Sequence, residues 1–117
     1  MKANTYTKFV LVVMVVLGLA ESGRAQTWNI GPDGSNTVTA TLSGGTLTVR
    51  GTGNMRDFSI SVIPPWKSGY LAEDNSITKV VIEEGVTSIG IGAFNNCIGL
   101  NEVTIGNSVT SVKLTLK

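Results

Sequence analysis

Apolar residues recur at a fixed interval along the second half of the chain. The stretch from Ile77 to Ile89 is followed by a second stretch in which each apolar position returns 23 residues later. The matched pairs are Ile77 and Leu100, Val80 and Val103, Ile82 and Ile105, Val86 and Val109, and Ile89 and Val112. A period of this length is typical of a solenoid, where each unit buries its apolar edge against the next. The pattern predicts about one and a half such units, the second incomplete.

Within one unit, the spacing predicts two short apolar edges followed by a helical turn. Residues 77–82 are expected to form the first solenoid strand, and Gly85 permits the turn into the second edge. Ala93 and Cys97 are four residues apart and would share one face of a helix, which predicts a short helical turn over residues 91–97. The predicted core of the repeats comprises Val80, Ile82, Val86, Ile89, Phe94, Cys97, Leu100, Val103, Ile105 and Val109.

The strand positions between these core residues are expected to face away from the core, because side chains alternate along a strand. They are Lys79, Val81, Glu102 and Thr104. We interpret them as a candidate protein-binding face. Four positions make a patch far below the ~800 Å² per partner of a standard interface, so the isolated chain is expected to bind matrix proteins weakly or not at all.

A β-hairpin is expected upstream of the repeats. Residues 38–42 and 47–50 alternate between apolar and polar side chains, and Gly44-Gly45 can take the positive φ of a tight turn. The residues expected to face one core are Val38, Ala40, Leu42, Leu47 and Val49, and those expected to face solvent are Thr39, Thr41, Thr48 and Arg50.

A third strand is expected where apolar residues alternate again over residues 58–62, ended by Pro64-Pro65. Trp66 follows and has two interpretations. It could be a platform on which a ligand stacks, or a plug that closes the end of the solenoid, which we favour. The polar stretch 67–76 then links this region to the first repeat.

The N-terminal segment has the pattern of a secretory signal peptide. Lys2 and Lys8 precede the apolar run of residues 9–20. Gly23 and Ala25 provide the small side chains that signal peptidase requires three residues and one residue before a cut, here placed before Gln26. The alternative is a membrane anchor. The apolar run would span roughly 18 Å as a helix, short of the ~30 Å hydrocarbon core, so a signal peptide is favoured and no membrane span is expected after its removal.

Charge and cysteine content narrow the function classes. Residues 1–25 hold three of the nine basic and one of the eight acidic residues, so six basic and seven acidic residues remain. This balance argues against nucleic acid as a partner, because phosphate binding needs clustered Lys and Arg. Cys97 is the only cysteine and there is no histidine. A buried core thiol is therefore favoured over a nucleophile or a zinc ligand.

No cofactor or metal site is expected from the remaining motifs. The Gly-x-Gly at residues 51–53 lacks the helix start of a phosphate-binding loop. The Asp-Gly-Ser-Asn turn at residues 33–36 lacks the further carboxylates that calcium requires.

Two acidic pairs are the best candidates for an enzyme. Glu73-Asp74 and Glu83-Glu84 could supply the two carboxylates of a glycoside hydrolase. Neighbours in an extended strand point to opposite faces, however, so adjacent acids do not make that geometry unaided. A solvated turn is the simpler interpretation, and no catalytic residue is predicted.

The repeat residues resemble the BspA-like leucine-rich repeats of bacterial surface proteins. The segments that match in order and spacing are Val86-Thr87-Ser88-Ile89, Ala93-Phe94-Asn95-Asn96-Cys97 and Leu100. Residues 47–55 and 64–66 also look like the segment that often precedes such repeats, so the resemblance covers residues 40–112. It implies an exported or surface-exposed protein whose repeats bind other proteins, as adhesins towards host matrix or other cells do.

We therefore expect a mainly β protein with a signal peptide (1–25), a small β cap (26–74) and the start of a leucine-rich-repeat solenoid (75–117) with one short helical turn. The expected function is non-catalytic protein binding at the cell surface or beyond. The alternatives are a truncated structural cap without binding activity and, least favoured, part of a secreted carbohydrate-active enzyme. The expected partner is an extracellular protein, and the open solenoid end is a candidate site of self-association.

Overall fold

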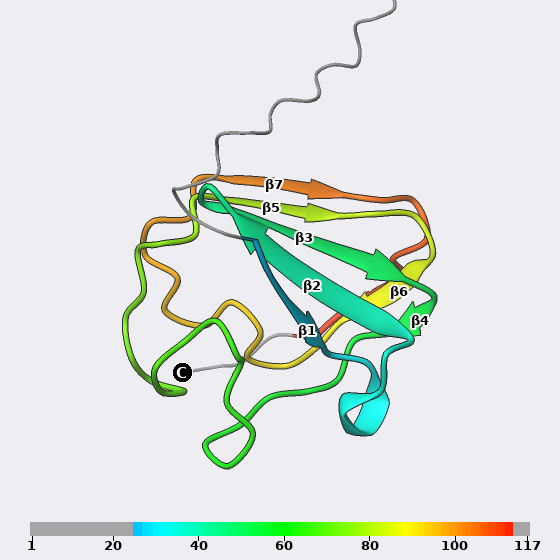
Figure 1. The fold of residues 1–117 in the computed structure, drawn as a ribbon. Coiled ribbons are helices and arrows are strands. Elements are labelled where there is room, and N and C mark those ends of the chain that lie inside the picture. Colours follow the sequence, from blue (N-terminus) through cyan, green and yellow to red (C-terminus); the bar gives the residue numbers. More distant parts are fainter. Residues whose placement is uncertain (1–24, 114–117) are drawn as a thin grey trace, which may run out of the picture.

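The computed structural model describes residues 25–113, which form two β-sheets around one core (Figure 1). The predicted signal peptide therefore lies outside the described residues, apart from residue 25. The five-stranded sheet has, in spatial order, β1 (Gln26–Asn29), β2 (Val38–Ser43), β3 (Thr46–Gly51), β5 (Lys79–Ile82) and β7 (Glu102–Ile105). The three-stranded sheet has β4 (Gly53–Asn54), β6 (Val86–Ile89) and β8 (Ser111–Val112). A 3-10 helix (Pro32–Gly34) is the one helix of the described residues. The mainly β fold class is confirmed.

The predicted hairpin is confirmed as β2 and β3. These strands pair antiparallel from Ser43 and Thr46 onward, and the turn between them has φ of 59° at Gly44 and 84° at Gly45. Both values lie where glycine is the favoured residue, which is why two glycines close this turn. Of the five apolar side chains expected on one face, all but the partly buried Leu42 are fully buried.

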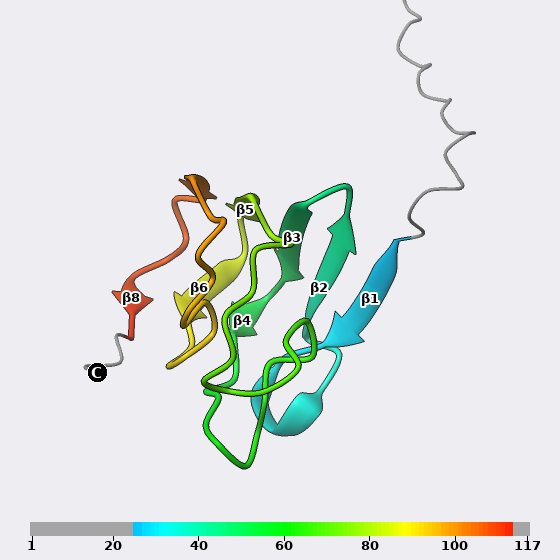
Figure 2. The same cartoon turned by 90° about the vertical axis from the view of Figure 1, so that its left-hand side faces the viewer.

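Residues that are one repeat period apart in the sequence pair with each other on adjacent strands of the solenoid. β5 pairs parallel with β7, with Val80 opposite Val103, and β6 pairs parallel with β8, with Ser88 opposite Ser111. Matched sequence positions therefore become neighbours on adjacent strands. Figure 2 shows how the strands of both sheets follow one another along the solenoid axis.

The solenoid sheets do not start at the first predicted repeat. β3 pairs parallel with β5, placing Thr46 opposite Lys79, and β4 pairs parallel with β6, placing Gly53 opposite Val86. The second strand of the hairpin is thus the first strand of the parallel ladder. Its sequence offset to the next strand is larger than the repeat period, because the loop between β4 and β5 is longer than its counterpart between β6 and β7.

The third strand predicted over residues 58–62 is wrong. Ser59 and Val62 exchange backbone hydrogen bonds of 2.9 and 3.1 Å, which closes a tight turn with Ile60 at its tip. Phe58 is buried, but Ile60 is 74% exposed. The alternation of apolar residues has the period of a strand, although only Phe58 is part of the buried core.

The helical turn predicted at residues 91–97 is a series of tight turns instead. Backbone N–H groups of Ala93 and Cys97 donate to the carbonyls of Gly90 and Phe94, each of which lies at position i−3. Asn96 has φ of 58°, which lies in the left-handed region and interrupts a helix. Ala93 is nevertheless buried and Phe94 packs against the core, as the predicted pattern requires.

Trp66 lies at the centre of the core rather than at an end of the solenoid. Its ring centroid is 6.1 Å from Trp28, 5.7 Å from Phe58 and 5.9 Å from Phe94. The indole Nε1–H donates a hydrogen bond of 3.2 Å to the carbonyl of Ala93. The predicted plug at the solenoid end is therefore wrong. Because Trp66 is 7% exposed, it is also no stacking platform for a ligand.

Candidate interaction surface

The outer face of the five-stranded sheet is lined by polar and β-branched side chains. Strand pairing places Thr48 beside Val81 and Val81 beside Thr104. The complete row across the sheet is Thr27, Thr41, Thr48, Val81 and Thr104. Because side chains alternate along each strand, this row faces away from the buried residues on the other side of the sheet. Every member of the row is exposed or half-buried.

A second row lies next to the first and carries charge. Its members, from β2 to β7, are Ser43, Thr46, Lys79 and Glu102. Lys79 Nζ lies 3.7 Å from Glu102 Oε2, so opposite charges meet across the pair β5–β7. The four residues predicted as a binding face thus lie together on this surface, with Lys79 and Val81 half-buried and Glu102 and Thr104 exposed.

The surface is wider than the sequence predicted. The outward positions of β2 and β3 were expected to face solvent as part of a separate cap, but Thr41 and Thr48 continue the row of Val81 and Thr104. Thr27 on β1 was not predicted at all, and its hydroxyl shares a hydrogen bond of 2.9 Å with that of Thr41. The alternation of β1 is too short to reveal its outward face.

An ion pair closes one edge of this surface. Arg50 Nη2 donates to Glu83 Oε2 at 3.1 Å, and Arg50 Nε donates to Glu83 Oε1 at 3.3 Å. The hydrogen bond from Arg50 holds the pKa of the Glu83 carboxyl below its usual value, and the same bond raises the pKa of Arg50. Both side chains are about half exposed, so solvent screens the pair.

Replacing Glu83 with glutamine is expected to lower the free energy of unfolding at neutral pH by less than about 1 kcal/mol. Because the folded-state pKa of Glu83 is depressed, the contribution is present above the pKa of Glu83 in the unfolded chain and is lost as pH falls through the folded pKa. Urea unfolding of both forms between acidic and neutral pH measures this difference. Glu73→Gln, at an exposed loop position, is the control. A difference that grows towards low pH would contradict the assignment.

Three residues of the acidic pairs, Asp74, Glu83 and Glu84, make polar contacts within the fold. Glu84, the neighbour of Glu83, accepts hydrogen bonds from the Asn107 backbone N–H at 2.8 Å and from the Ser108 hydroxyl at 3.1 Å. Asp74 Oδ1 accepts from the backbone N–H and the hydroxyl of Ser76 at 2.8 and 2.7 Å. Glu83 and Glu84 therefore contact different segments, and their positions are explained by folding contacts. Among residues 25–113, no group of three or more Cys, Asp or Glu side chains is arranged to hold a metal ion.

Cys97 is partly rather than fully buried. Its backbone forms an isolated parallel bridge with that of Asp74, and its side chain carries a free thiol. Burial raises the pKa of its thiol, an effect that the nearby Lys67 opposes and Asp74 reinforces. A thiol with a raised pKa is a weak nucleophile at neutral pH.

The burial of the predicted repeat core residues decreases along the solenoid, from β5 and β6 to β7. Four residues are buried, namely Val80, Ile82, Val86 and Ile89. Three pack against the core while partly exposed, namely Phe94, Leu100 and Val109. Val103 and Ile105 are 49% and 46% exposed, so their prediction as core residues is wrong for the described chain. They face inward, but no further unit covers them among residues 25–113.

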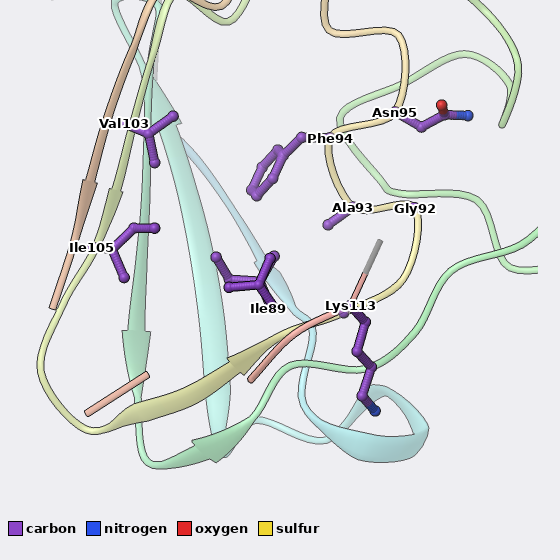
Figure 3. Close-up of a pocket in the computed structure, with 10 residues that line it drawn as sticks. Ile89, Gly92, Ala93, Phe94, Asn95, Val103, Ile105 and Lys113 are labelled. Atoms are coloured by element: carbon purple, nitrogen blue, oxygen red, sulfur yellow. The ribbon is translucent and has the colours of Figure 1, made fainter. Parts of the chain in front are cut away.

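These half-exposed residues line an apolar groove of about 330 Å³ at the open end. Figure 3 shows Val103 and Ile105 on one side, with Phe94, Ala93 and Ile89 facing them across the groove. Val112 of β8 also lines it and is 50% exposed. The described chain thus offers two surfaces, the polar outer sheet face and this apolar end.

In residues 25–113 no helix has the length and apolar content that crossing a membrane would require.

Comparison with known proteins identifies one family and one solved structure. Residues 67–115 match the family described as BspA type leucine rich repeat region. The chain is also similar to the crystal structure of a leucine-rich repeat protein from Eubacterium ventriosum, with 34% identity and a TM-score of 0.64. That match covers 77% of this chain and 22% of the solved protein, so the chain spans less than a quarter of its relative's length. No curated protein matches the chain.

Proposed function

We propose that this chain, whose residues 67–115 match the BspA type leucine rich repeat region, is a non-catalytic protein-binding module that acts outside the cell. The single observation that carries the proposal is the uncovered outer face of the five-stranded sheet. The predicted signal peptide supports export, and the repeat family supports a role in adhesion to extracellular proteins.

The chemistry of the outer face suits a protein partner. Threonine side chains offer both a methyl group and a hydroxyl that donates and accepts hydrogen bonds. Lys79, Arg50, Glu83 and Glu102 place both signs of charge on the face, and their pairing keeps the face close to neutral. A surface of this kind supports a specific polar contact more readily than a purely electrostatic one.

The size of the face sets the expected strength of binding. The four predicted residues alone are far too few, but the row of Thr27, Thr41, Thr48, Val81 and Thr104 crosses all five strands, and the charged row beside it runs from β2 to β7. Even so, the charged and hydroxyl-bearing face contains no exposed aromatic anchor of the kind that dominates tight interfaces. We therefore expect a dissociation constant weaker than about 1 μM for one copy of the chain.

Binding of the purified chain to immobilised fibronectin and type I collagen tests the proposal. Val81→Arg places a bulky cation at the centre of the row of threonines, and we expect it to weaken saturable binding at least about tenfold, which corresponds to about 1.4 kcal/mol. Leu71→Arg is the matched control, because Leu71 is an exposed aliphatic side chain on a loop.

Equal binding by the wild type and both variants would show that the outer sheet face is not the contact surface. Absence of saturable binding to either matrix protein would contradict the proposed adhesion to matrix. Circular dichroism of both variants verifies that the fold is retained.

A further inference from the structure

The open end of the solenoid combines an unpaired strand edge with an apolar groove. Among residues 25–113, β7 is an edge strand of its sheet, and every residue in it is exposed. The inward side chains of β7 line the groove with Ile89 and Phe94 (Figure 3). Natural proteins usually protect such an edge with proline, lysine or a bulge. The sequence of β7, Glu-Val-Thr-Ile, contains none of these.

We propose that this end pairs with the same end of a second copy of the chain, through β7 running antiparallel to β7 about a two-fold axis at Thr104. The two five-stranded sheets then form one continuous sheet. The inward side chains of each copy cover the groove of the other. A two-fold contact of this kind is self-complementary and closes without forming fibres.

The sequence of β7 selects this register. Residues that face each other across an antiparallel pair lie on the same side of the sheet, so inward residues must meet inward residues. With Thr104 on the axis, Val103 lies opposite Ile105 of the second copy, and this apolar pair occurs twice. Glu102 then lies opposite Gly106, so no like charges meet.

Each neighbouring two-fold register is less favourable. An axis at Glu102 places two carboxylates opposite each other, which is destabilising. An axis at Val103 places Asn101 opposite Ile105 on the apolar side, and an axis at Ile105 places Val103 opposite Asn107. Only the register at Thr104 places both inward residues of β7, Val103 and Ile105, opposite apolar partners.

The opposite edge of the sheet is a poorer partner for β7. The inward positions of β1 are Gln26, which is polar and exposed, and Trp28, which already packs against Trp66. Pairing of β7 with β1 would also be head to tail and would extend without closure. The two-fold pairing of β7 with itself avoids both problems.

Cysteine cross-linking tests the register directly. In a Cys97→Ala background, which removes the one native thiol, Thr104→Cys places two thiols opposite each other on the axis. Opposed residues in an antiparallel pair have Cα atoms ~4.5–5.5 Å apart, within the range that a disulfide spans. Thr27→Cys is the matched control, because Thr27 is an exposed outward threonine on the other edge strand.

We expect the Thr104→Cys chain to become a disulfide-linked dimer under mild oxidation and the Thr27→Cys chain to remain largely uncoupled. The wild-type chain should have twice the monomer mass in sedimentation equilibrium. Ile105→Glu should halve that mass, with an unchanged circular dichroism spectrum because Ile105 is already half exposed in the single chain. A monomeric wild type at every concentration, or equal cross-linking at both cysteine positions, would overturn the proposal. These readouts do not depend on binding to matrix proteins, so the two proposals can fail separately.

Discussion

Replacing Trp66 with alanine is expected to lower the free energy of unfolding by about 3–5 kcal/mol. The indole ring lies within 6.1 Å, between ring centroids, of Trp28 of β1, Phe58 of the long loop and Phe94 of the repeat. Its removal leaves a cavity at the junction of the cap and the repeats and leaves the Ala93 carbonyl without its indole donor.

Urea unfolding followed by circular dichroism measures this loss. Trp66→Phe keeps an aromatic ring but lacks the Nε1–H donor, so it should lower the free energy of unfolding clearly less than Trp66→Ala does. Ile60→Ala is the control for a large apolar residue outside the core, because Ile60 is 74% exposed, and it should change stability by less than about 0.5 kcal/mol. Equal effects of Trp66→Ala and Ile60→Ala would show that the core is not organised around Trp66.

Replacing Gly90 with alanine is expected to destabilise the protein by about 3 kcal/mol, the upper end of the cost of overpacking. Gly90 follows β6 and lies directly against the backbone of the cap. A Cβ at this position would lie 1.9 Å from the carbonyl oxygen and 2.7 Å from the carbonyl carbon of Arg56. Backbone atoms cannot move aside as a flexible side chain can, so β6 and the cap must separate.

Gly69→Ala is the matched control for this substitution. A Cβ at Gly69 would lie 3.8 Å from the Ala72 side chain, which is ordinary van der Waals contact. We expect it to be neutral or slightly stabilising, because alanine reduces the freedom of the unfolded chain. Thermal unfolding of both variants gives the comparison, and a tolerated Gly90→Ala would mean that the cap does not pack against β6 as described.

The repeats could be predicted because, in a solenoid, residues one repeat period apart in the sequence become neighbours in space. The constant interval between matched apolar positions became the register of β5 with β7 and of β6 with β8. The hairpin could be predicted for a similar reason, since the alternation in β2 and β3 and the glycine pair between them are local signals.

The parts that could not be predicted depend on long-range contacts. The parallel pairing of Thr46 with Lys79 has a longer offset than the repeat period, because the loop between β4 and β5 is long, so the repeat pattern does not reveal it. Lys67 was expected in a polar linker, but it is buried and its ammonium donates to the carbonyls of Tyr70, at 2.7 Å, and Asn95. Such a lysine satisfies carbonyls of two loops at once, which no local pattern reveals.

Only part of the candidate site could be predicted, because the rest of it depends on the long-range pairing of strands. Lys79, Val81, Glu102 and Thr104 follow from alternation within the repeats, and the structure places them on one face. The continuation of that face over Thr48 and Thr41 follows only from the pairing of β3 with β5. Exposure of Val103 and Ile105 could not be predicted from their pattern, because the pattern marks which way a side chain faces and not what covers it.

The cap and the repeats share one core and present one continuous sheet face. Urea unfolding of the wild-type chain, followed in parallel by tryptophan fluorescence and far-ultraviolet circular dichroism, tests this arrangement most directly. Trp28 and Trp66 report on the cap, and the dichroism reports on the strands of both parts. If the cap and the repeats share one core, both probes should show one transition with the same midpoint. Loss of the fluorescence signal at a lower urea concentration than the dichroism would contradict it, because the cap would then unfold apart from the repeats.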